Sequence, residues 1–521
     1  MRRTQLLADP HGIFLHDAIL DSCRRFGEKI AIVDTSCSPP RQISYAEYGA
    51  LIEKVAHGLL QAGLKPGELI AIYLPNSWEF CATYHAATLV GAVPTLLNPS
   101  CREREVRYQL ANSGAAMLVT DTRIKEINLS GLSALRRVYT TRDHVAGAET
   151  FSDLLRGSLH TLPTPAQPSE ETIAALPYSS GTTGLPKGVM LSHFNLVANV
   201  YQLLGPNAST LKPSDVMLCF LPLYHIYGLN VVLNPALLLG ATVVLMPRFD
   251  LPAALHIIRE HSITWMACVP PVLNAFALAA GQGLFPTNHD VTWVKSGAAP
   301  LAPELARRFT ALTGIPICQG YGMTEASPVT HLGYLTPDFY RPETIGEPLA
   351  HTECRLLDEN GVEAPMGVAG ELVMRGPQFM LGYWKEPQAT AAALRDGWYW
   401  SGDVATRDAD FYSIVDRRKE MIKYKGFAVA PAEVEAVLLE HSAVRDCGVV
   451  GQRDAAAGEL PLAFVVLREG FAADTRTAND LCCFVAERLT SYKQPRSIRF
   501  VQAIPRTPSG KILRRELREL L

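Results

Sequence analysis

A ten-residue segment at positions 179–188 has the composition of a phosphate-binding loop. Its sequence, Ser-Ser-Gly-Thr-Thr-Gly-Leu-Pro-Lys-Gly, combines four hydroxyl side chains, three glycines and one lysine. Bare backbone N–H groups, hydroxyl donors and a positive charge are the groups that hold a polyphosphate. Pro186 and the glycines exclude a regular helix, and Lys187 follows a proline, so the segment differs from a Walker A loop. The alternative interpretation is a flexible Gly/Ser linker.

Other side chains could act on a phosphorylated substrate. Glu325 could bind a hard cation, although Thr324 and Glu325 could equally cap a helix. Asp403 follows a glycine, which by itself indicates a β-turn. Lys511 offers a compact charge on a long arm, but surrounding arginines make a merely basic tail the alternative. His225 has no carboxylate or cysteine at metal-ligand spacing, which leaves a pocket or core role.

Length and composition bound the class of protein. With 521 residues the chain is too long for one hydrophobic core, so we expect at least two domains. A net charge of −3 argues against a nucleic-acid partner, and 11 cysteines without C-x-x-C spacing fit a reducing cytosol. The apolar run at 229–246 contains Asn, Pro and Gly, so it predicts a buried strand and helix rather than a membrane span. We therefore expect a cytoplasmic protein without stable membrane insertion.

Helix-length and strand-length patterns alternate along most of the chain and predict an α/β fold. Residues 89–120 and 239–269 repeat one order of elements, in which Gly-Ala precedes a strand, a helix and a second strand. We predict a large N-terminal domain, 1–415, of layered α/β subdomains plus a β-rich subdomain, and a small α+β C-terminal domain at 421–521. Helices are expected at 45–63, 79–91, 102–112, 252–261, 431–440 and 479–489, and strands at 69–74, 116–120, 264–269, 444–450 and 460–468.

Five downstream motifs extend this pattern in a fixed order. They are Gln319-Gly-Tyr-Gly-Met-Thr-Glu325, Tyr399-Trp-Ser-Gly-Asp403, Asp416-Arg417, Lys423-Tyr-Lys-Gly-Phe427 and Pro508-Ser-Gly-Lys511. Together with 179–188 they resemble the adenylate-forming superfamily of acyl-CoA synthetases, adenylation domains and luciferases. The resemblance covers nearly the whole chain. It is strongest toward 4-coumarate–CoA ligases and luciferases, through His225-Ile-Tyr227, Lys295-Ser-Gly-Ala-Ala-Pro300 and residues 423–431.

The resemblance implies a reaction in two halves. A carboxylate attacks the α-phosphate of ATP and gives an acyl-adenylate and pyrophosphate. A nucleophile, usually the CoA thiol, then displaces AMP. Cations and N–H donors must offset the repulsion between the carboxylate and the triphosphate. A mobile C-terminal domain is implied too, with a hinge at 416–420 that turns it between the two halves.

The resemblance also implies roles for single residues. Lys511 would approach the carboxylate and the α-phosphate, Thr324 would contact that phosphate, and Glu325 would hold Mg²⁺. Lys423 would enter the site as Lys511 leaves, and His225 would stand beside the acyl group. The predicted ATP and CoA contacts are Ser179, Ser180, Gly181, Thr182, Thr183, Lys187, Arg248, Ala299, Gln319, Gly320, Tyr321, Asp403, Arg417, Lys419, Lys425 and Gly426. The predicted acid-binding residues are Tyr227, Val231, Gly297, Gly322, Val329 and Leu332.

Two positions depart from the coumarate-ligase pattern. Val231 stands where those enzymes tend to carry a small polar residue. Ala428 stands where they often have an AMP-facing Gln, and loss of that amide removes one hydrogen bond, about 1 kcal/mol.

We expect an AMP-forming carboxylate–CoA ligase for an aromatic or medium-chain acid, with ATP, Mg²⁺ and CoA. The alternatives are an amide-bond synthetase that uses an amine or amino acid, transfer to a carrier-protein thiol, a luciferase, and a silent nucleotide-binding protein. The sequence leaves the acid, the oligomeric state and the pathway open.

Overall fold

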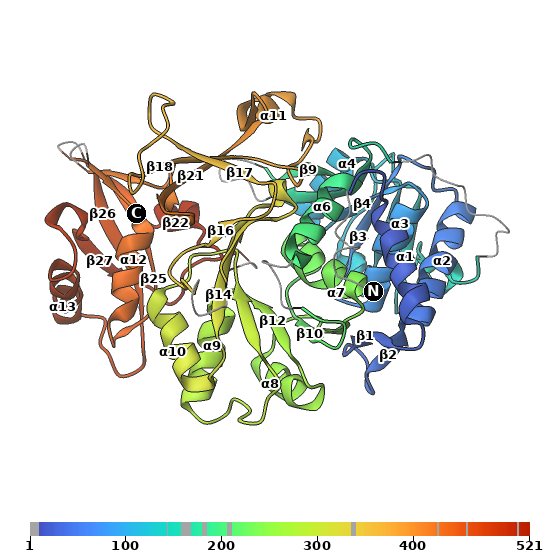
Figure 1. Cartoon of the computed structure of the whole chain (residues 1–521), viewed down its shortest axis with the longest axis horizontal. Coiled ribbons are helices and arrows are strands. Elements are labelled where there is room, and N and C mark those ends of the chain that lie inside the picture. Colours follow the sequence, from blue (N-terminus) through green and yellow to red (C-terminus); the bar gives the residue numbers. More distant parts are fainter. Residues whose placement is uncertain are drawn as a thin grey trace.

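The computed structural model describes residues 10–142, 144–157, 168–179, 185–205, 211–334, 340–424, 427–454, 457–507 and 510–521. The blue N-terminal part lies at the right of Figure 1, the green and yellow elements lie in the middle, and the orange and red C-terminal part lies at the left. Nine-stranded and eight-stranded sheets dominate, and two five-stranded sheets follow later in the chain. The chain is therefore a mixed α/β protein with a large N-terminal domain and a C-terminal domain, as the sequence predicts.

The eight-stranded sheet is built mainly from parallel strands. Its order is β19-β9-β8-β4-β3-β5-β6-β7. Every residue of the central strand β3 is buried, because helices cover both faces of such a sheet. The strands are β3 (Leu69–Tyr73), β4 (Val93–Leu96), β5 (Met117–Thr120), β6 (Arg137–Thr140), β7 (Glu149–Thr150), β8 (Ile173–Ser179), β9 (Lys187–Ser192) and β19 (Gly382–Tyr383).

The nine-stranded sheet has the order β16-β15-β14-β13-β12-β10-β11-β1-β2. Strands β11 to β14 and β10 are parallel, whereas β15 and β16 turn back in antiparallel pairs. The strands are β1 (Ile30–Asp34), β2 (Arg41–Ser44), β10 (Val216–Cys219), β11 (Thr242–Leu245), β12 (Trp265–Cys268), β13 (Trp293–Ser296), β14 (Ile317–Gly322), β15 (Val329–Leu332) and β16 (Glu347–Pro348).

The repeat predicted from the sequence is confirmed in the pairing of these strands. In one sheet β3 lies between β4 and β5, and in the other β10 lies between β11 and β12, all in parallel. In each copy one helix joins the second strand to the third: α4 (Glu103–Ser113) and α8 (Leu251–Glu260). The two copies therefore share both the order of their elements and their connectivity.

Helices fill the space between and around the two sheets. Helix α3 is buried along its whole length and shares one hydrophobic cluster with both sheets, so it lies in the middle layer. Helix α4 packs on another face through Val106 and Leu110. The remaining helices of this part are α1 (Leu15–Phe26), α2 (Tyr45–Gln61), α3 (Trp78–Leu89), α5 (Phe151–Leu154), α6 (His193–Leu204), α7 (Asn234–Leu239), α9 (Pro270–Gly281), α10 (Pro303–Thr313) and the 3₁₀ helix η2 (Thr122–Glu126).

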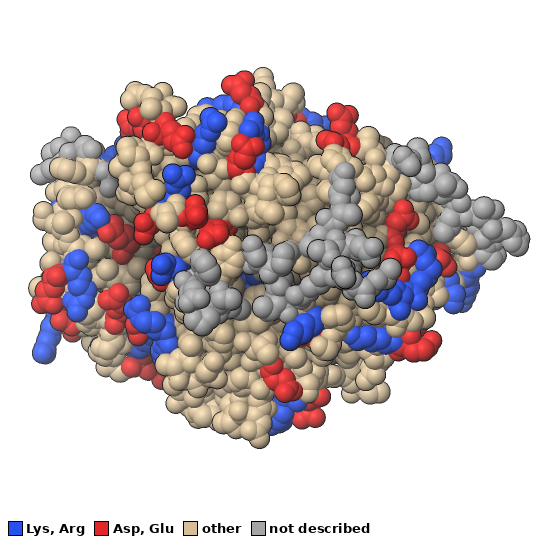
Figure 2. All heavy atoms as spheres, viewed as in Figure 1, with Lys and Arg blue, Asp and Glu red and all other residues tan. Residues whose placement is uncertain are grey.

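The apolar run at 229–246 forms a helical stretch followed by a strand. It comprises the π-helix η3 (Gly228–Leu233), then α7, which ends at Gly240 in a left-handed conformation, and then β11. Among the described residues, no helix has both the length and the apolar character that crossing a membrane requires. On the face shown in Figure 2, acidic and basic residues are interspersed, in line with the small net charge.

The β-rich part follows as one antiparallel sheet. Its elements are β17 (Glu353–Leu357), β18 (Gly370–Arg375), α11 (Pro387–Ala393), β20 (Leu394–Arg395), β21 (Trp398–Asp408) and β22 (Phe411–Arg417). Strands β17, β18 and β21 cross the top of Figure 1, between the eight-stranded sheet and the C-terminal part.

The C-terminal part has its own sheet and two small hydrophobic clusters. Strands β25 and β26 form an antiparallel hairpin, and β26 and β27 are parallel, with α13 between them in sequence. Helix α12 has the predicted bounds, whereas α13 begins four residues early because Asp474 caps it through the Thr477 amide. The elements are β23 (Ile422–Tyr424), β24 (Phe427–Val429), α12 (Pro431–Glu440), β25 (Val444–Asp454), β26 (Gly458–Leu467), α13 (Thr475–Ala486), η6 (Ser491–Lys493), β27 (Ser497–Phe500) and α14 (Arg514–Glu519).

Candidate active site

Two segments that carry predicted ATP and CoA contacts, one with Ala299 and one with Gln319, Gly320 and Tyr321, meet near the ends of β13 and β14. Ligands of parallel α/β sheets bind at this carboxyl edge of the strands. A Cβ atom added to Gly297, just after β13, would lie 3.1 Å from the Tyr227 hydroxyl oxygen and 3.4 Å from the Gly320 carbonyl oxygen. The Tyr227 hydroxyl donates in turn to the carbonyls of Cys268 and Lys295, each at 3.3 Å. The glycine thus permits close contact between the turn after β13, the Tyr227 ring and β14.

Tyr321, Asp403 and Arg417 form one polar group. The Tyr321 hydroxyl donates to Asp403 Oδ2 at 2.5 Å, and Arg417 Nε lies 3.1 Å from Asp403 Oδ1. Asp403 and Arg417 face each other across the β21–β22 pair, which sets their spacing. The Asp403 side chain is 6% exposed, so an ion pair with a hydrogen bond compensates its buried charge. Burial raises the pKa of Tyr321 well above its usual value, and Asp403 adds to the effect.

Lys511 lies within electrostatic reach of this group. Burial is the largest cause that lowers its pKa to about 8, and Arg417 lowers it further, whereas Asp403, Glu420 and Glu325 favour the ammonium form. The preceding Gly510 has φ +84°, and a Cβ on it would lie 3.1 Å from Pro271 Cδ at the start of α9. Lys511 of the C-terminal domain therefore lies against the large domain, close to Asp403 and Arg417.

The loop that carries Lys511 is braced within its own domain. The Thr507 amide donates to the Lys511 carbonyl at 2.8 Å, and the Lys511 amide donates to Thr507 Oγ1 at 3.1 Å. Arg506 donates to the Gly510 carbonyl at 2.7 Å and forms an ion pair with Asp446 at 2.7 Å. Thr507, Gly510 and Lys511 are thus tied to one another and, through Arg506 and Asp446, to β25.

Thr324 and Glu325 lie in the 3₁₀ turn η4 (Thr324–Ala326) rather than at the start of an α-helix. Both are buried. The Tyr383 hydroxyl donates to Glu325 Oε1 at 2.9 Å, and Lys187 Nζ lies 5.3 Å from the centroid of the Tyr383 ring. Tyr383 thus joins the predicted phosphate-loop lysine to the predicted metal carboxylate. Sequence reasoning missed it, because no motif signals that β19 pairs with β9 and brings Tyr383 to this position.

The described residues fit a cation held by few protein ligands. No group of three or more His, Cys, Asp and Glu suited to a metal exists among them. Mg²⁺ typically takes one or two carboxylates and fills its other positions with water and substrate phosphates. Glu325 offers one carboxylate near Lys511 and Asp403, which suits that arrangement.

The predicted acid-binding residues are mostly apolar and buried. Val231 lies in the π-helix η3, and Val329 and Leu332 lie on β15. His225 Nδ1 accepts a hydrogen bond from the Tyr227 amide at 3.2 Å, and burial lowers the His225 pKa to about 4. The imidazole is therefore neutral at physiological pH.

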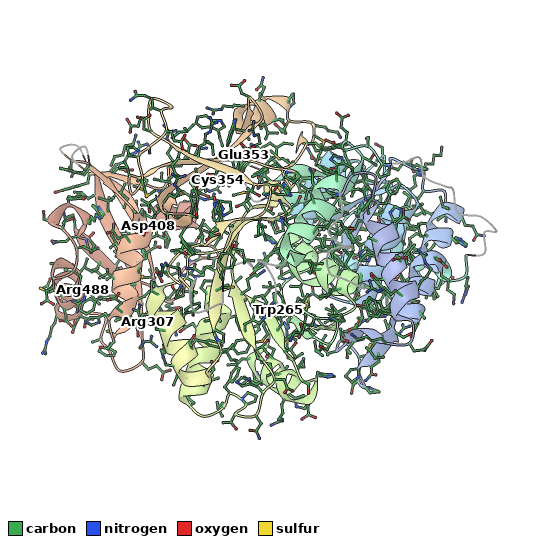
Figure 3. All side chains as sticks on the ribbon, in the orientation of Figure 1. Trp265, Arg307, Glu353, Cys354, Asp408 and Arg488 are labelled. Atoms are coloured by element: carbon green, nitrogen blue, oxygen red, sulfur yellow. The ribbon has the colours of Figure 1, made fainter. Side chains whose placement is uncertain are left out.

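A buried lysine adjoins this region. Lys295 Nζ lies 5.8 Å from the ring centroid of Trp265 and 5.6 Å from that of Trp293. Figure 3 shows Trp265 on β12. Burial lowers the Lys295 pKa to about 8.

Several predicted residues lie away from these contacts. Lys423, Lys419 and Arg248 are exposed, and the Lys423 amide donates to Glu459 Oε2 at 2.8 Å in its own sheet. The Gln319 amide donates to the Pro342 carbonyl at 2.7 Å, and Gly322 is held so close that a Cβ would lie 1.9 Å from the Pro328 carbonyl oxygen. Ser179 ends β8, and Ala299 is half-buried. Ser180, Gly181, Thr182, Thr183, Lys425 and Gly426 lie outside the described residues.

Comparison with known proteins places the chain in a family. Residues 19–384 match the model of AMP-binding enzymes, and residues 433–511 match that of the AMP-binding enzyme C-terminal domain. The chain is 38% identical over 530 residues to 4-coumarate–CoA ligase 5 of Oryza sativa subsp. japonica, covering 99% of this chain and 96% of that protein.

Solved structures agree with this match. ATP-bound MatB from Rhodopseudomonas palustris has a TM-score of 0.86 and 27% identity, over 96% of this chain and 98% of its own. The anthranilate CoA ligase AuaEII, in complex with anthranoyl-AMP, has a TM-score of 0.89 and 25% identity, over 100% and 99%. The family models alone cover most of the sequence, and the fold and the convergence of the motifs agree with them. The chain belongs to the AMP-binding enzyme family.

Proposed function

We propose that this protein is an AMP-forming carboxylate–CoA ligase. It activates a carboxylic acid with ATP and transfers the acyl group to CoA. The observation that carries the proposal is the convergence of Lys511 with Tyr321, Asp403, Arg417 and Glu325. The relationship to 4-coumarate–CoA ligases along almost the whole chain supports CoA as the acceptor.

In the first half-reaction a carboxylate oxygen of the acid attacks the α-phosphorus of ATP. A new P–O bond forms, the bond to the β-phosphate oxygen breaks, and pyrophosphate leaves. Lys511 stabilises the charge that builds between the two anions, because a buried ammonium acts in a low dielectric. Asp403 and Arg417 hold the ribose hydroxyls, and Tyr321 stacks on the adenine. Glu325 would hold Mg²⁺, which would supply further charge compensation.

In the second half-reaction the CoA sulfur attacks the acyl carbon. A C–S bond forms, the bond to the AMP oxygen breaks, and the thiol proton passes to solvent. We assign the large domain to 1–415, the hinge to 416–420 and the C-terminal domain to 421–521. Arg418 forms an ion pair with Glu371 and its amide donates to the Gly402 carbonyl at 2.8 Å, which supports a pivot at the adjacent Lys419. Lys423, which is exposed on β23, then faces CoA; we propose the same role for Lys425 and Gly426, and a contact of Arg248 with the CoA nucleotide.

The acid is aromatic or of medium chain length. Val231, Val329 and Leu332 supply an apolar lining, and the named relatives act on coumarate and anthranilate. A cytoplasmic location belongs to the same proposal, since all 11 cysteines are free in the structure.

Pyrophosphate release over a panel of acids tests the proposal. Each acid is assayed with CoA, with a mixture of amines, and with neither. Release that accelerates with CoA, together with a thioester product, supports the ligase and names its acid class. Release that accelerates only with amines assigns the chain to amide synthesis instead, and no release with any acid contradicts both.

A further inference from the structure

A buried amide on helix α6 holds the backbone of Val329. Asn199 has no exposed surface. Its Nδ2 donates to the Val329 carbonyl at 2.8 Å, and its Oδ1 accepts from the Val329 amide at 3.1 Å. These are the two bonds that a residue of a neighbouring strand would form. The side chain therefore fixes both the position and the rotation of this peptide at the start of β15.

The turn that carries Thr324 and Glu325 lies just before Val329, the residue whose backbone Asn199 holds. Ser327, two residues before Val329, has φ +65°, which a non-glycine residue keeps only where its surroundings hold it. The Ser327 carbonyl accepts from Asn230 Nδ2 at 2.6 Å, and the Glu325 carbonyl accepts from the Met380 amide at 2.8 Å. The Asn199 bonds form the third attachment of this turn, on its acid-pocket side.

Further hydrogen bonds fix the Asn199 amide itself. Its Nδ2 also donates to Gln202 Oε1 at 3.0 Å, one turn later on α6. Gln202 Nε2 donates to the Ala350 carbonyl at 2.6 Å and to Gln378 Oε1 at 3.2 Å. Ala350 lies three residues before β17, the strand on which Figure 3 labels Glu353 and Cys354, and Gln378 lies three residues after β18. The network leaves Asn199 one orientation, with its oxygen toward the Val329 amide.

We propose that Asn199 is a positioning residue for adenylation. Its hydrogen bonds go to Val329 and Gln202, and neither residue is assigned here to ATP or to the metal. By holding Val329 it sets the wall of the acid pocket, and because Val329 follows the η4 turn closely in sequence it also holds the end of the turn that carries Thr324 and Glu325. The inference rests on the proposed function, because acid and phosphate must meet in register for the attack.

The chain offers a matched control on the same helix. Asn195 is 4% exposed, accepts from the Ser192 amide at 2.9 Å and donates to the Pro377 carbonyl at 2.8 Å. Asn195→Ala therefore removes a buried amide of equal size, with bonds to other segments. Asn199→Asp keeps the shape and the acceptor, but its carboxylate faces the Val329 carbonyl without a proton to donate. Asn199→Ser is the milder variant if alanine impairs folding.

The test measures ATP–pyrophosphate exchange with a series of acids of graded size. For Asn199→Ala and Asn199→Asp we expect a loss of about tenfold or more in kcat/KM for the preferred acid and a changed order among the acids. The KM for ATP should change by less than about threefold, because the Tyr321–Asp403 group is untouched. In Asn195→Ala the order of acids should stay as in the wild type.

Hydrogen exchange over residues 323–332 separates this inference from the proposed function. Faster exchange in Asn199→Ala than in Asn195→Ala supports the attachment, whether or not an acid has been identified. Equal exchange, or an acid order unchanged in Asn199→Asp, overturns it. A wild-type protein inactive on every acid contradicts the proposed function, and the exchange result then decides alone whether Asn199 holds the turn.

Discussion

The pKa of Lys511 leads to a specific expectation for the pH dependence of adenylation. Burial and Arg417 lower this pKa from 10.5 to about 8. If the ammonium form stabilises the transition state, activity is present below pH 8 and is lost as the pH rises through that value. The ratio of the ammonium to the amine form of Lys511 is about 10:1 at pH 7 and about 1:10 at pH 9. The kcat/KM of adenylation should therefore fall roughly tenfold between these two pH values.

Two substitutions of Lys511 distinguish the effect of its positive charge from the effect of its deprotonation at high pH. Lys511→Ala should lower the rate of adenylation by about 10²–10³-fold, as when one preorganised charge or donor is lost from an active site. Lys511→Arg should be slow because its geometry differs, yet it should lose the alkaline fall, since arginine stays protonated throughout this range. ATP–pyrophosphate exchange from pH 6 to 9.5 measures both, with circular dichroism to verify folding.

Lys295 is the necessary control, because burial lowers its pKa to about 8 as well. If Lys295 caused the alkaline fall, Lys511→Arg would keep it and Lys295→Met would remove it. Normal exchange in Lys511→Ala would refute the catalytic assignment outright. Thioester formation from preformed acyl-adenylate should survive in Lys511→Ala, because in the proposed mechanism this step uses a second pose of the small domain, from which Lys511 is withdrawn.

Three further expectations follow from single contacts. Tyr321→Phe removes the 2.5 Å bond to Asp403 and should raise the KM for ATP about tenfold, while an unchanged KM would argue against a nucleotide role. Tyr383→Phe frees Glu325 Oε1, so the Mg²⁺ concentration for half-maximal exchange should shift severalfold; identical titrations would separate Tyr383 from metal binding. Gly510→Ala strains a φ of +84° and presses on Pro271, so it should slow adenylation more than thioester formation, and equal effects would contradict its place in the first pose.

Local sequence patterns predicted the helices and strands better than they predicted which of them lie side by side. The parallel strands were readable as apolar runs, since burial on both faces removes the alternation of polar and apolar residues. Helix α12 matches its predicted bounds, and β3 ends one residue early. The duplicated order of elements was visible because each copy needs the same Gly-Ala turn before its strand, and strand pairing confirms it.

Site residues could be predicted only where they belong to a sequence motif whose residue types indicate a chemical role. Asp403 and Arg417 are both predicted ATP or CoA contacts, and the register of β21 on β22 brings them together. Tyr383 and Asn199 were not found. Their function depends on which strand lies beside which, and a tyrosine after glycine or an asparagine inside a helix gives no local signal of that. The roles assigned to Lys423, Lys419 and Arg248 stay predictions, since these exposed side chains lie away from the contacts described here.

The Glu325 turn and Lys511 are held in the site by different kinds of contact. The Glu325 turn is held by buried hydrogen bonds from Met380, Asn230 and Asn199, so it cannot shift without leaving polar groups unpaired. Lys511 reaches the same centre from the C-terminal domain, and the adjacent Gly510 packs against Pro271 of the large domain. An enzyme that must bind one adenylate through two steps benefits from this division. In the proposed mechanism the groups that hold the intermediate keep their place, while the cation used in the first step leaves with the C-terminal domain.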